Sequence, residues 1–356
     1  MKPIFTATTL CGAIALTTAC SAPPTSDPAS ILSDGEYSTN TINVSRFASG
    51  GFIKIDGSST VFPISYEAAQ RYQRDVTDAP AIAVTFSGTG SGFEKFCAGE
   101  TDINNASRPI TADEMQVCKE NGIAYTELPI ALDAITVVVN PENTWAEDIT
   151  VEELKTIWQP AAEGQITNWN QVRSSWPDRP LTLYGPGEES GTFDYFTEVI
   201  DDAAGASRTD YTQSEDDSVL VEAVSEDPNA LGYFGLGYYA ANWNRLKSLA
   251  VDNGQQASQP TVDAIKNSGY QPLTRPLFIY VDTEALQAKP ELQSFVQYYL
   301  KGVQNWVPFV GYVPLERETY RLVSERLEQQ VVGTVYGGTL DSELSVEEML
   351  QKESVY

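Results

Sequence analysis

The chain has 356 residues, 42% of them hydrophobic, and is long enough to build two packed lobes. Its formal charge of -27 argues against nucleic acid or an anionic membrane surface as a partner, because both attract basic proteins. It contains no histidine, which excludes a Ser-His-Asp hydrolase and argues against zinc catalysis.

The N-terminal residues have the features of an export signal. An apolar stretch, 4–19, is short for a membrane span and ends at Cys20. This run resembles a bacterial lipoprotein signal, whose cleavage leaves the cysteine as a lipidated first residue, although Thr17 stands where an aliphatic residue is usual. An ordinary secretory signal with an incidental Cys20 is the alternative. We expect 1–20 to be the signal peptide and 21–50, rich in Ser, Thr, Pro, Ala and Asn, to be a flexible tether.

From Phe52 onward, short apolar strands alternate with segments of helical periodicity. The expected strands are 52–55, 81–86, 101–106 and 123–128, and the expected helices are 61–74, 92–98 and 113–121. This alternation favours a parallel sheet with crossover helices.

Two cysteines, Cys97 and Cys118, remain once the signal is removed. In an oxidising compartment an even pair favours a disulfide, which would contribute about 3 kcal/mol by the chain-entropy estimate. Two buried free thiols are the alternative. Neither is expected to bind a metal, since no histidine or third cysteine is available.

A second α/β unit follows the β-branched run 134–139, which ends at Asn140-Pro141 and is expected to leave the first lobe. Helices are expected at 151–158, 191–200, 218–225, 291–302 and 315–330, and strands at 181–184 and 276–281. Two crossing strands would join the lobes, and the cleft between such lobes is a favoured ligand site. The expected division is lobe I at 51–138 and 276–340, lobe II at 139–275, and a C-terminal tail at 341–356.

Three segments, 56–61, 87–92 and 189–192, place glycines and hydroxyl residues where a strand is expected to turn into a helix. A helix start exposes unpaired N–H groups and the positive end of the helix dipole, so each turn can hold an anion. Each could equally be a plain N-cap, worth about 1 kcal/mol. Together they favour a buried site that holds a small oxyanion through hydrogen bonds. The candidate ligands are Ser59, Thr60, the N–H of Val61, Ser91, Ser190, Gly191 and Thr192.

Asp102 and Arg108 belong to a polar segment between the second and third turns. Arg108 can offer two parallel donors to an oxyanion. A buried Asp102 would accept a hydrogen bond from a protonated phosphate oxygen but would repel fully ionised sulfate. A surface ion pair or a turn is the alternative interpretation of both residues.

The motifs occur in a characteristic order: Asp-Gly-Ser-Ser-Thr-Val-x-Pro from Asp56, Gly-x-Gly-Ser-Gly from Gly88, Thr-Asp-x-x-x-Ala-Ser-Arg-Pro-Ile from Thr101, and Glu-Ser-Gly-Thr from Glu189. With the 230–235 segment, this set resembles the PstS-like phosphate-binding proteins of bacterial phosphate ABC transporters.

The resemblance implies an α/β, type II periplasmic-binding-protein fold. It has two lobes, each a mixed sheet flanked by helices, with two crossing strands as the hinge, which we place near 138–141 and 274–277. It also implies one dehydrated phosphate held by the candidate ligands above, with Asp102 as the proton acceptor. Many members have an arginine where this chain has Pro186, so Arg108 is expected to supply the guanidinium, and Ser107 is a further candidate.

The expected partners are inorganic phosphate and the permease subunits of an ABC transporter. No cofactor or metal is implied, and the chain is expected to be an exported monomer that meets the membrane only through a lipid anchor. Three alternatives remain: a receptor for another oxyanion such as arsenate or sulfate, a phosphate sensor, and a carboxylate-metal phosphatase. Asp102 speaks against sulfate, and the acidic residues lack the spacing of a metal site.

Overall fold

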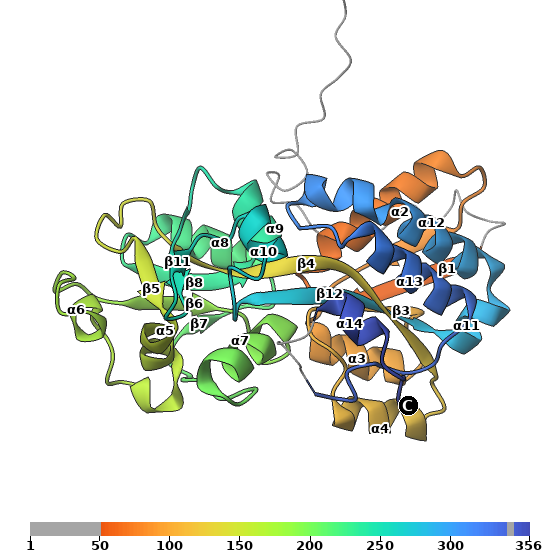
Figure 1. Ribbon diagram of the computed structural model, residues 1–356, viewed down its shortest axis with the longest axis horizontal. Coiled ribbons are helices and arrows are strands. Elements are labelled where there is room, and N and C mark those ends of the chain that lie inside the picture. The colour runs from red at the N-terminus through yellow and green to blue at the C-terminus, as the bar shows by residue number, and fades with distance from the viewer. Residues whose placement is uncertain (1–50, 340–344) are drawn as a thin grey trace, which may run out of the picture.

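The computed structural model describes residues 51–339 and 345–356 (Figure 1). The predicted signal peptide, Cys20 and the tether at 21–50 lie outside the described residues. No helix in the described ranges has both the length and the hydrophobicity needed to cross a membrane.

One mixed sheet runs through both halves of the molecule (Figure 1). Within the described ranges its strands are β1 (Phe52–Gly57), β2 (Ala81–Val84), β3 (Ile103–Ala106), β4 (Tyr125–Val139), β6 (Thr182–Gly185), β7 (Thr212–Gln213), β8 (Ala230–Gly235), β9 (Lys247–Ser248) and β12 (Thr274–Asp282). The order is β2-β1-β3-β12-β4-β8-β6-β7, with β9 also paired to β4. The outer pairs in both halves are parallel, whereas β4 and β12 run antiparallel to their neighbours, so the sheet is mixed.

The long strand β4 connects the two halves. It pairs with β12 from Tyr125 to Ala134 and with β8 from Ile135 to Val139. We therefore define lobe I as 51–134, 274–339 and 345–356, and lobe II as 135–273. On β4 this change of partner lies about four residues before the predicted hinge at 138–141, while β12 begins where the second crossing was predicted.

Helices cover both faces of the lobe I sheet. They are α2 (Phe62–Asp75), α3 (Thr89–Cys97), α4 (Ala112–Glu120), α11 (Thr283–Ala288), α12 (Pro290–Trp306), η3 (Val307–Val310), α13 (Arg317–Glu328) and α14 (Val346–Leu350). On one face, α2, α12 and α13 pack around Ile55, Phe295 and Val323. On the other, α3 and α14 contribute Phe93, Phe96 and Met349 to a second core. Where it is described, the predicted C-terminal tail thus packs onto lobe I.

Lobe II is built in the same way. Its helices are α5 (Val151–Trp158), η2 (Pro160–Ala162), α6 (Trp169–Val172), α7 (Gly191–Asp201), α8 (Asp217–Glu226), α9 (Leu236–Ala241) and α10 (Val262–Lys266), and a small sheet joins β5 (Asp148–Thr150), β10 (Ala250–Asp252) and β11 (Ala257–Ser258). One core contains stacked Phe196 and Tyr233 with Trp158 against them. The other, under α8 and α9, contains Leu220 and Phe234.

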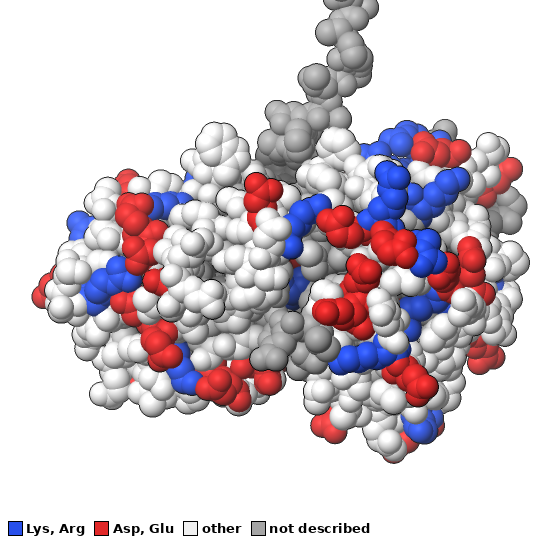
Figure 2. Space-filling model, viewed as in Figure 1, with Lys and Arg blue, Asp and Glu red and all other residues white. Residues whose placement is uncertain are grey.

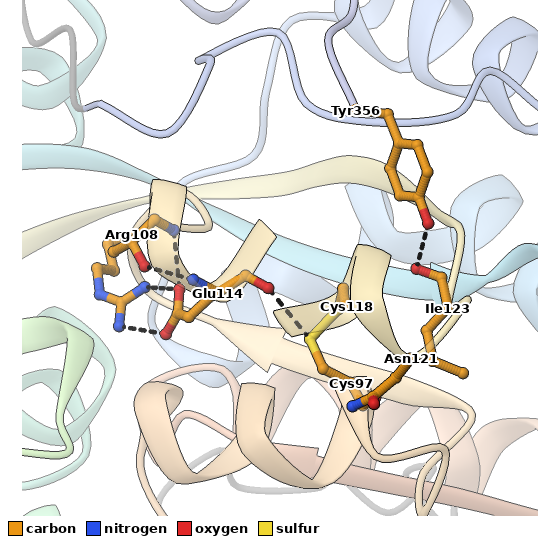
Figure 3. The surroundings of a disulfide bond; sticks show 8 residues. Cys97, Arg108, Glu114, Cys118, Asn121, Ile123 and Tyr356 are labelled. Carbon is orange, nitrogen blue, oxygen red and sulfur yellow. Dashed lines mark hydrogen bonds and ion pairs between the residues drawn. A yellow bond between two sulfur atoms is a disulfide. The ribbon is translucent and has the colours of Figure 1, made fainter. Parts of the chain in front are cut away.

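The predicted disulfide is confirmed: Cys97, the last residue of α3, is bonded to Cys118 of α4 (Figure 3). Residue Glu114, one helical turn before Cys118, forms a capping box with Thr111. The disulfide therefore ties the C-terminal half of α4 to α3, and the capping box stabilises the start of α4.

Acidic and basic side chains are interspersed over both lobes on the face seen in Figure 2. The net charge of -27 is therefore not gathered into one acidic patch on that face.

Candidate functional site

The starts of α2 and α3 in lobe I face the starts of α7 and α8 in lobe II. The Oγ1 atoms of Thr60 and Thr192 lie 3.1 Å apart, and Ser59 Oγ donates to Asp217 Oδ2 at 3.4 Å. All four side chains are at most 3% exposed. The first and third predicted turns, far apart in sequence, therefore meet in the buried space between the lobes.

The guanidinium of Arg275, on β12, lies at this meeting point and is fully buried. Nη2 donates to Thr192 Oγ1 at 2.8 Å and to Thr60 Oγ1 at 3.5 Å. Nη1 donates to the carbonyl oxygens of Ser107 and Gly191, both at 3.0 Å. Arg275 thus contacts hydroxyl and carbonyl groups from both lobes.

A buried carboxylate on the other crossing strand holds Arg275 in place. Asp133 faces Arg275 in the β4–β12 register, and its Oδ2 accepts from Nε at 3.0 Å and Nη2 at 2.9 Å. Its Oδ1 accepts from the N–H of Leu236, at the start of α9. A buried cation is costly unless a buried anion lies beside it. Asp133 therefore holds the guanidinium of Arg275 in a fixed orientation, and the ion pair carries no net charge. We call Ser59, Thr60, Asp133, Gly191, Thr192, Asp217 and Arg275 the central cluster.

The turn before α2 supplies unused backbone donors to the central cluster. The N–H groups of Ser59, Thr60 and Val61 donate to no other group in the described part of the chain. Val61 is the N-cap, without a side-chain cap, so the positive end of α2 is uncompensated at this point. Such a helix start attracts an anion.

The lobes approach so closely that only glycine fits at one position. A Cβ at Gly191 would lie 2.5 Å from Thr89 Oγ1 and 2.7 Å from Ser107 Oγ. A larger residue would therefore hold α7 away from lobe I.

Two of the predicted hydroxyl ligands have other partners. Ser190 Oγ caps α7 by accepting from the N–H of Thr192 at 3.1 Å. Ser91 is partly exposed, and its Oγ donates to Glu189 Oε2 at 3.0 Å. At the start of α3 it is instead Thr89, fully buried, that lies against Ser107 and Gly191.

Asp102 lies away from the central cluster and has partners of its own. Its Oδ1 accepts from Lys289 Nζ at 2.6 Å and its Oδ2 from the N–H of Lys54 at 2.9 Å. Asp102 precedes β3, whereas Ser107, next to the central cluster, follows it. The carboxylate therefore lies at the amino end of the strand, away from the helix starts.

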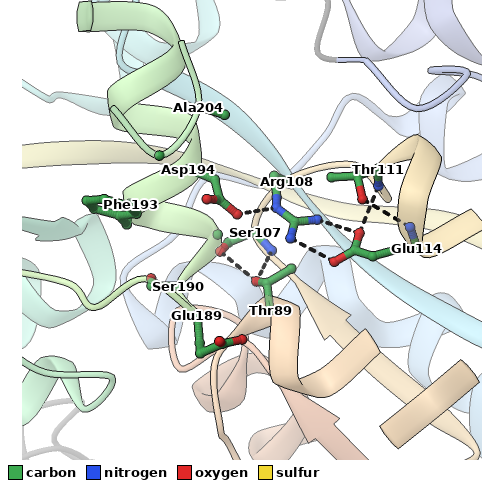
Figure 4. A network of polar contacts seen from close by, with 12 residues as sticks. Thr89, Ser107, Arg108, Thr111, Glu114, Glu189, Ser190, Phe193, Asp194 and Ala204 are labelled. Carbon is green, nitrogen blue, oxygen red and sulfur yellow. Dashed lines mark hydrogen bonds and ion pairs between the residues drawn. The ribbon is translucent and has the colours of Figure 1, made fainter. Parts of the chain in front are cut away.

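Arg108 does not supply the central guanidinium either. Its Nη1 and Nη2 donate to the two carboxylate oxygens of Glu114, each at 2.8 Å, and its Nε donates to Asp194 Oδ2 at 2.6 Å (Figure 4). We call Arg108, Glu114 and Asp194 the interlobe ion cluster, since Asp194 belongs to α7 of lobe II. Burial lowers the pKa of Arg108, but the two carboxylates outweigh this and raise it above its usual value. The predicted two-donor fork therefore exists, but it binds a carboxylate of the protein itself.

Sequence reasoning missed Arg275, Asp133 and Asp217. A visible signal existed for the first two, because each is a charged residue directly before an apolar strand predicted to connect the lobes, 134–139 or 276–281. Asp217 showed no such signal in the sequence, since its segment has the composition of an ordinary helix start.

Within the described residues, no group of three or more His, Cys, Asp or Glu side chains is arranged to hold a metal ion. The central cluster contains hydroxyl groups, one cation and the carboxyl groups of Asp133 and Asp217.

Comparison with known proteins places this site in a family. A family model described as the PBP superfamily domain matches residues 22–302. Protein SphX of Synechocystis sp. is 49% identical over 304 residues, 85% of this chain and 90% of SphX. The phosphate-binding protein PstS of Staphylococcus saprophyticus is 34% identical over 279 residues, 78% of this chain and 85% of that protein.

A solved structure titled as a possible phosphate binding protein from Planctomyces limnophilus is 42% identical. Its TM-score is 0.59, and the match covers 79% of this chain and 98% of that one. The two lobes, the mixed sheet and the crossing strands form the type II periplasmic-binding-protein fold that the sequence predicted. The chain therefore belongs to the PBP superfamily and, within it, to the PstS-like phosphate-binding proteins.

Proposed function

We propose that this chain captures inorganic phosphate between lobes I and II and delivers it to the permease subunits of an ABC transporter. The observation that carries the proposal is the buried guanidinium of Arg275 at the point where helix starts from both lobes meet. The relatives named as phosphate-binding proteins support the choice of anion.

The ligand set combines a cation, hydroxyl groups and backbone donors. Ser59, Thr60 and Thr192 offer hydroxyl groups, and the N–H groups of the α2 and α7 starts offer backbone donors, including those of Val61 and Gly191. Arg275 brings the positive charge, and it would exchange one or more of its hydrogen bonds within the protein for the anion. Ser190 contributes by capping α7. Such donors replace the water around a phosphate without flexible side chains, so the anion can be held dehydrated.

Capture requires the lobes to open and close about β4 and β12. We propose that phosphate favours the closed arrangement, because its ligands come from both lobes and meet only when these are together. A permease could then distinguish loaded from empty protein by the relative position of the lobes.

The setting of this function is outside the cytoplasm. The apolar run that ends at Cys20 supports export, with lipidation of Cys20 as the proposed anchor and a monomer as the acting unit. A sensor that binds phosphate without delivering it would share the site, and a permease-docking assay separates the two.

Other activities have less support. A phosphatase built on a metal cluster has no support among the described residues. An arsenate receptor would use the same donors, because arsenate carries the same proton and nearly the same shape as phosphate.

Isothermal titration tests the proposal. The protein is dialysed in denaturant to remove bound anion, refolded, and titrated with phosphate and then with sulfate. We expect tight phosphate binding and no sulfate signal. Absence of phosphate binding by refolded protein would overturn the proposal.

A further inference from the structure

The Cys97–Cys118 disulfide is a close neighbour of the interlobe ion cluster. Figure 3 shows Glu114 between Arg108 and the disulfide. Glu114 is one helical turn before Cys118 on α4, and its backbone oxygen lies 3.6 Å from Cys97 Sγ. The carboxylate that holds Arg108 and the covalent link to α3 therefore belong to the same short helix.

Helix α4 has few other contacts that could hold it on lobe I. Among its described residues, Ala112–Glu120, Cys118 alone is buried. Met115 packs only in part against the core that contains both cysteines. Beyond the end of the helix, Asn121 Nδ2 donates to the carbonyl oxygen of Cys97 at 2.9 Å. A short helix with one buried side chain gains little from packing, so the disulfide is the main anchor of α4.

Both helices joined by the disulfide reach across to the start of α7 in lobe II. From α3, the N–H of Gly90 donates to the carbonyl oxygen of Glu189 at 3.0 Å. From α4, Glu114 holds Arg108, whose Nε donates to Asp194 Oδ2 at 2.6 Å (Figure 4). These two contacts lie on either side of the first residue of α7, so the linked helices hold this helix start from two points.

We propose that the Cys97–Cys118 disulfide positions Arg108 for its contact with lobe II and thereby slows the release of phosphate. This inference rests on the proposed function. With the disulfide intact, α3 and α4 move as one unit, so both contacts with α7 form at the same position of the lobes. Without it, Glu114 shifts with α4, and each closure must again fix Arg108 toward Asp194 at a cost in conformational entropy.

A disulfide that only stabilises the fold would act differently. It would raise the unfolding free energy but leave the release of phosphate from folded protein unchanged. A positioning disulfide changes the release rate through Asp194, and it leaves the selectivity of the central cluster as it is.

Stopped-flow release of phosphate provides the test. The proteins are wild type, Cys97→Ala with Cys118→Ala, Asp194→Asn, and the three changes combined. The cysteine variant should release phosphate about 5- to 10-fold faster than wild type, and the combined variant at most about twice as fast as D194N, because both changes remove the same contact. Val323→Ala, in the core under α13, is the control for lost stability and should keep the wild-type rate.

The outcomes separate this inference from the proposed function. Wild-type release by the folded cysteine variant would overturn the inference, and so would effects that multiply in the combined variant. The proposed function would stand in both cases. Failure of wild type to bind phosphate would instead overturn the function itself.

Should the cysteine variant not fold, a redox equilibrium decides. Wild type and D194N are equilibrated with dithiothreitol, which passes two electrons and two protons to the disulfide, giving two thiols and its own cyclic disulfide. By reciprocity, phosphate should disfavour reduction of wild type by about 5- to 10-fold, and clearly less in D194N. An equal effect of phosphate on the two proteins would contradict the inference, because the disulfide would then act without Asp194.

Discussion

The same two lobes meet at two arginines, and the surroundings of these arginines differ. Arg275 is fully buried, contacts one carboxylate, and gives its other hydrogen bonds to hydroxyl and carbonyl oxygens. Arg108 is bound by two carboxylates, one from each lobe. The pair at Arg275 is formally neutral, and the neighbouring Asp217 adds no charge below about pH 8, because desolvation by burial raises its pKa to about 8. The interlobe ion cluster, with its carboxylates ionised, is negative.

This difference assigns distinct roles to the two regions. An anion is attracted to a neutral pair surrounded by helix starts, and is repelled by a group that already contains an excess of carboxylates. We therefore expect the central cluster to hold the ligand and the interlobe ion cluster to stabilise the closed arrangement without touching the ligand.

The largest expected effect is at Arg275. Arg275→Gln should reduce phosphate affinity by about 1000-fold or more, because it removes the only cation of the central cluster and a positive charge that no backbone donor replaces. Isothermal titration measures the loss. Arg275→Gln should also destabilise the fold by about 3 kcal/mol or more, since Asp133 is left buried and unpaired.

A double variant separates these two effects of Arg275→Gln. Asp133→Asn with Arg275→Gln should recover most of the stability in urea unfolding, because no charge is left unpaired, but none of the phosphate affinity. Recovery of binding would mean that Arg275 acts through the fold alone.

The pH dependence of stability should differ between the two regions. The pKa of Asp217 is raised by burial to about 8, so folded protein holds a proton that the unfolded chain, with an ordinary pKa near 4, has released. The unfolding free energy should therefore fall as pH rises from about 4 to about 8, by on the order of 5 kcal/mol from this group.

Urea unfolding of anion-free protein at pH 5, 6.5 and 8 measures this slope. D217N should show a shallower slope, while Asp194→Asn, in the interlobe ion cluster, serves as the comparison. An unchanged slope in D217N would show that Asp217 is ionised in the folded protein at every pH tested.

A smaller effect is expected at the interlobe ion cluster. Asp194→Asn should weaken phosphate binding by about 10-fold, because it removes a contact made only when the lobes are closed. The loss should appear as faster release in stopped-flow measurements, with unchanged selectivity between phosphate and sulfate. A change in selectivity would place this cluster at the ligand.

The smallest effect is expected at Asp102. Asp102→Asn removes an ion pair with Lys289 on the far side of lobe I. It should change stability by about 1 kcal/mol or less and leave phosphate affinity and selectivity at the wild-type values, measured by titration. If the Asp102→Asn variant bound sulfate, Asp102 would be the residue that rejects sulfate, as the sequence predicted.

Local sequence signals were sufficient to predict helix starts such as that of α5 and much of the fold. The helix expected at 151–158 is α5, with the capping box of Thr150 and Glu153 at its start. Hydroxyl residues before an apolar run predict such a start, because the interactions are local.

The separation of Asp102 from the central cluster has a simple geometric cause. Asp102 and Arg108 lie at opposite ends of β3, and six residues of extended chain span about 20 Å. Two side chains so placed cannot both face one small anion, and this follows from the strand prediction itself.

The central cation could not be located from the sequence in the same way. Its identification requires the register that sets Arg275 opposite Asp133, and that register depends on how the two crossing strands pair. The burial of Asp217 likewise depends on the packing of α8 against the other lobe.

A crystal structure of the protein grown with phosphate tests the central claim most directly. We predict a tetrahedral anion in the central cluster, within hydrogen-bond distance of the Arg275 guanidinium, the N–H of Val61 and the hydroxyl of Thr192, with the Arg108 contacts to Glu114 and Asp194 unchanged. An anion bound to Arg108, or phosphate-bound protein in which Arg275 contacts no anion, would contradict the account.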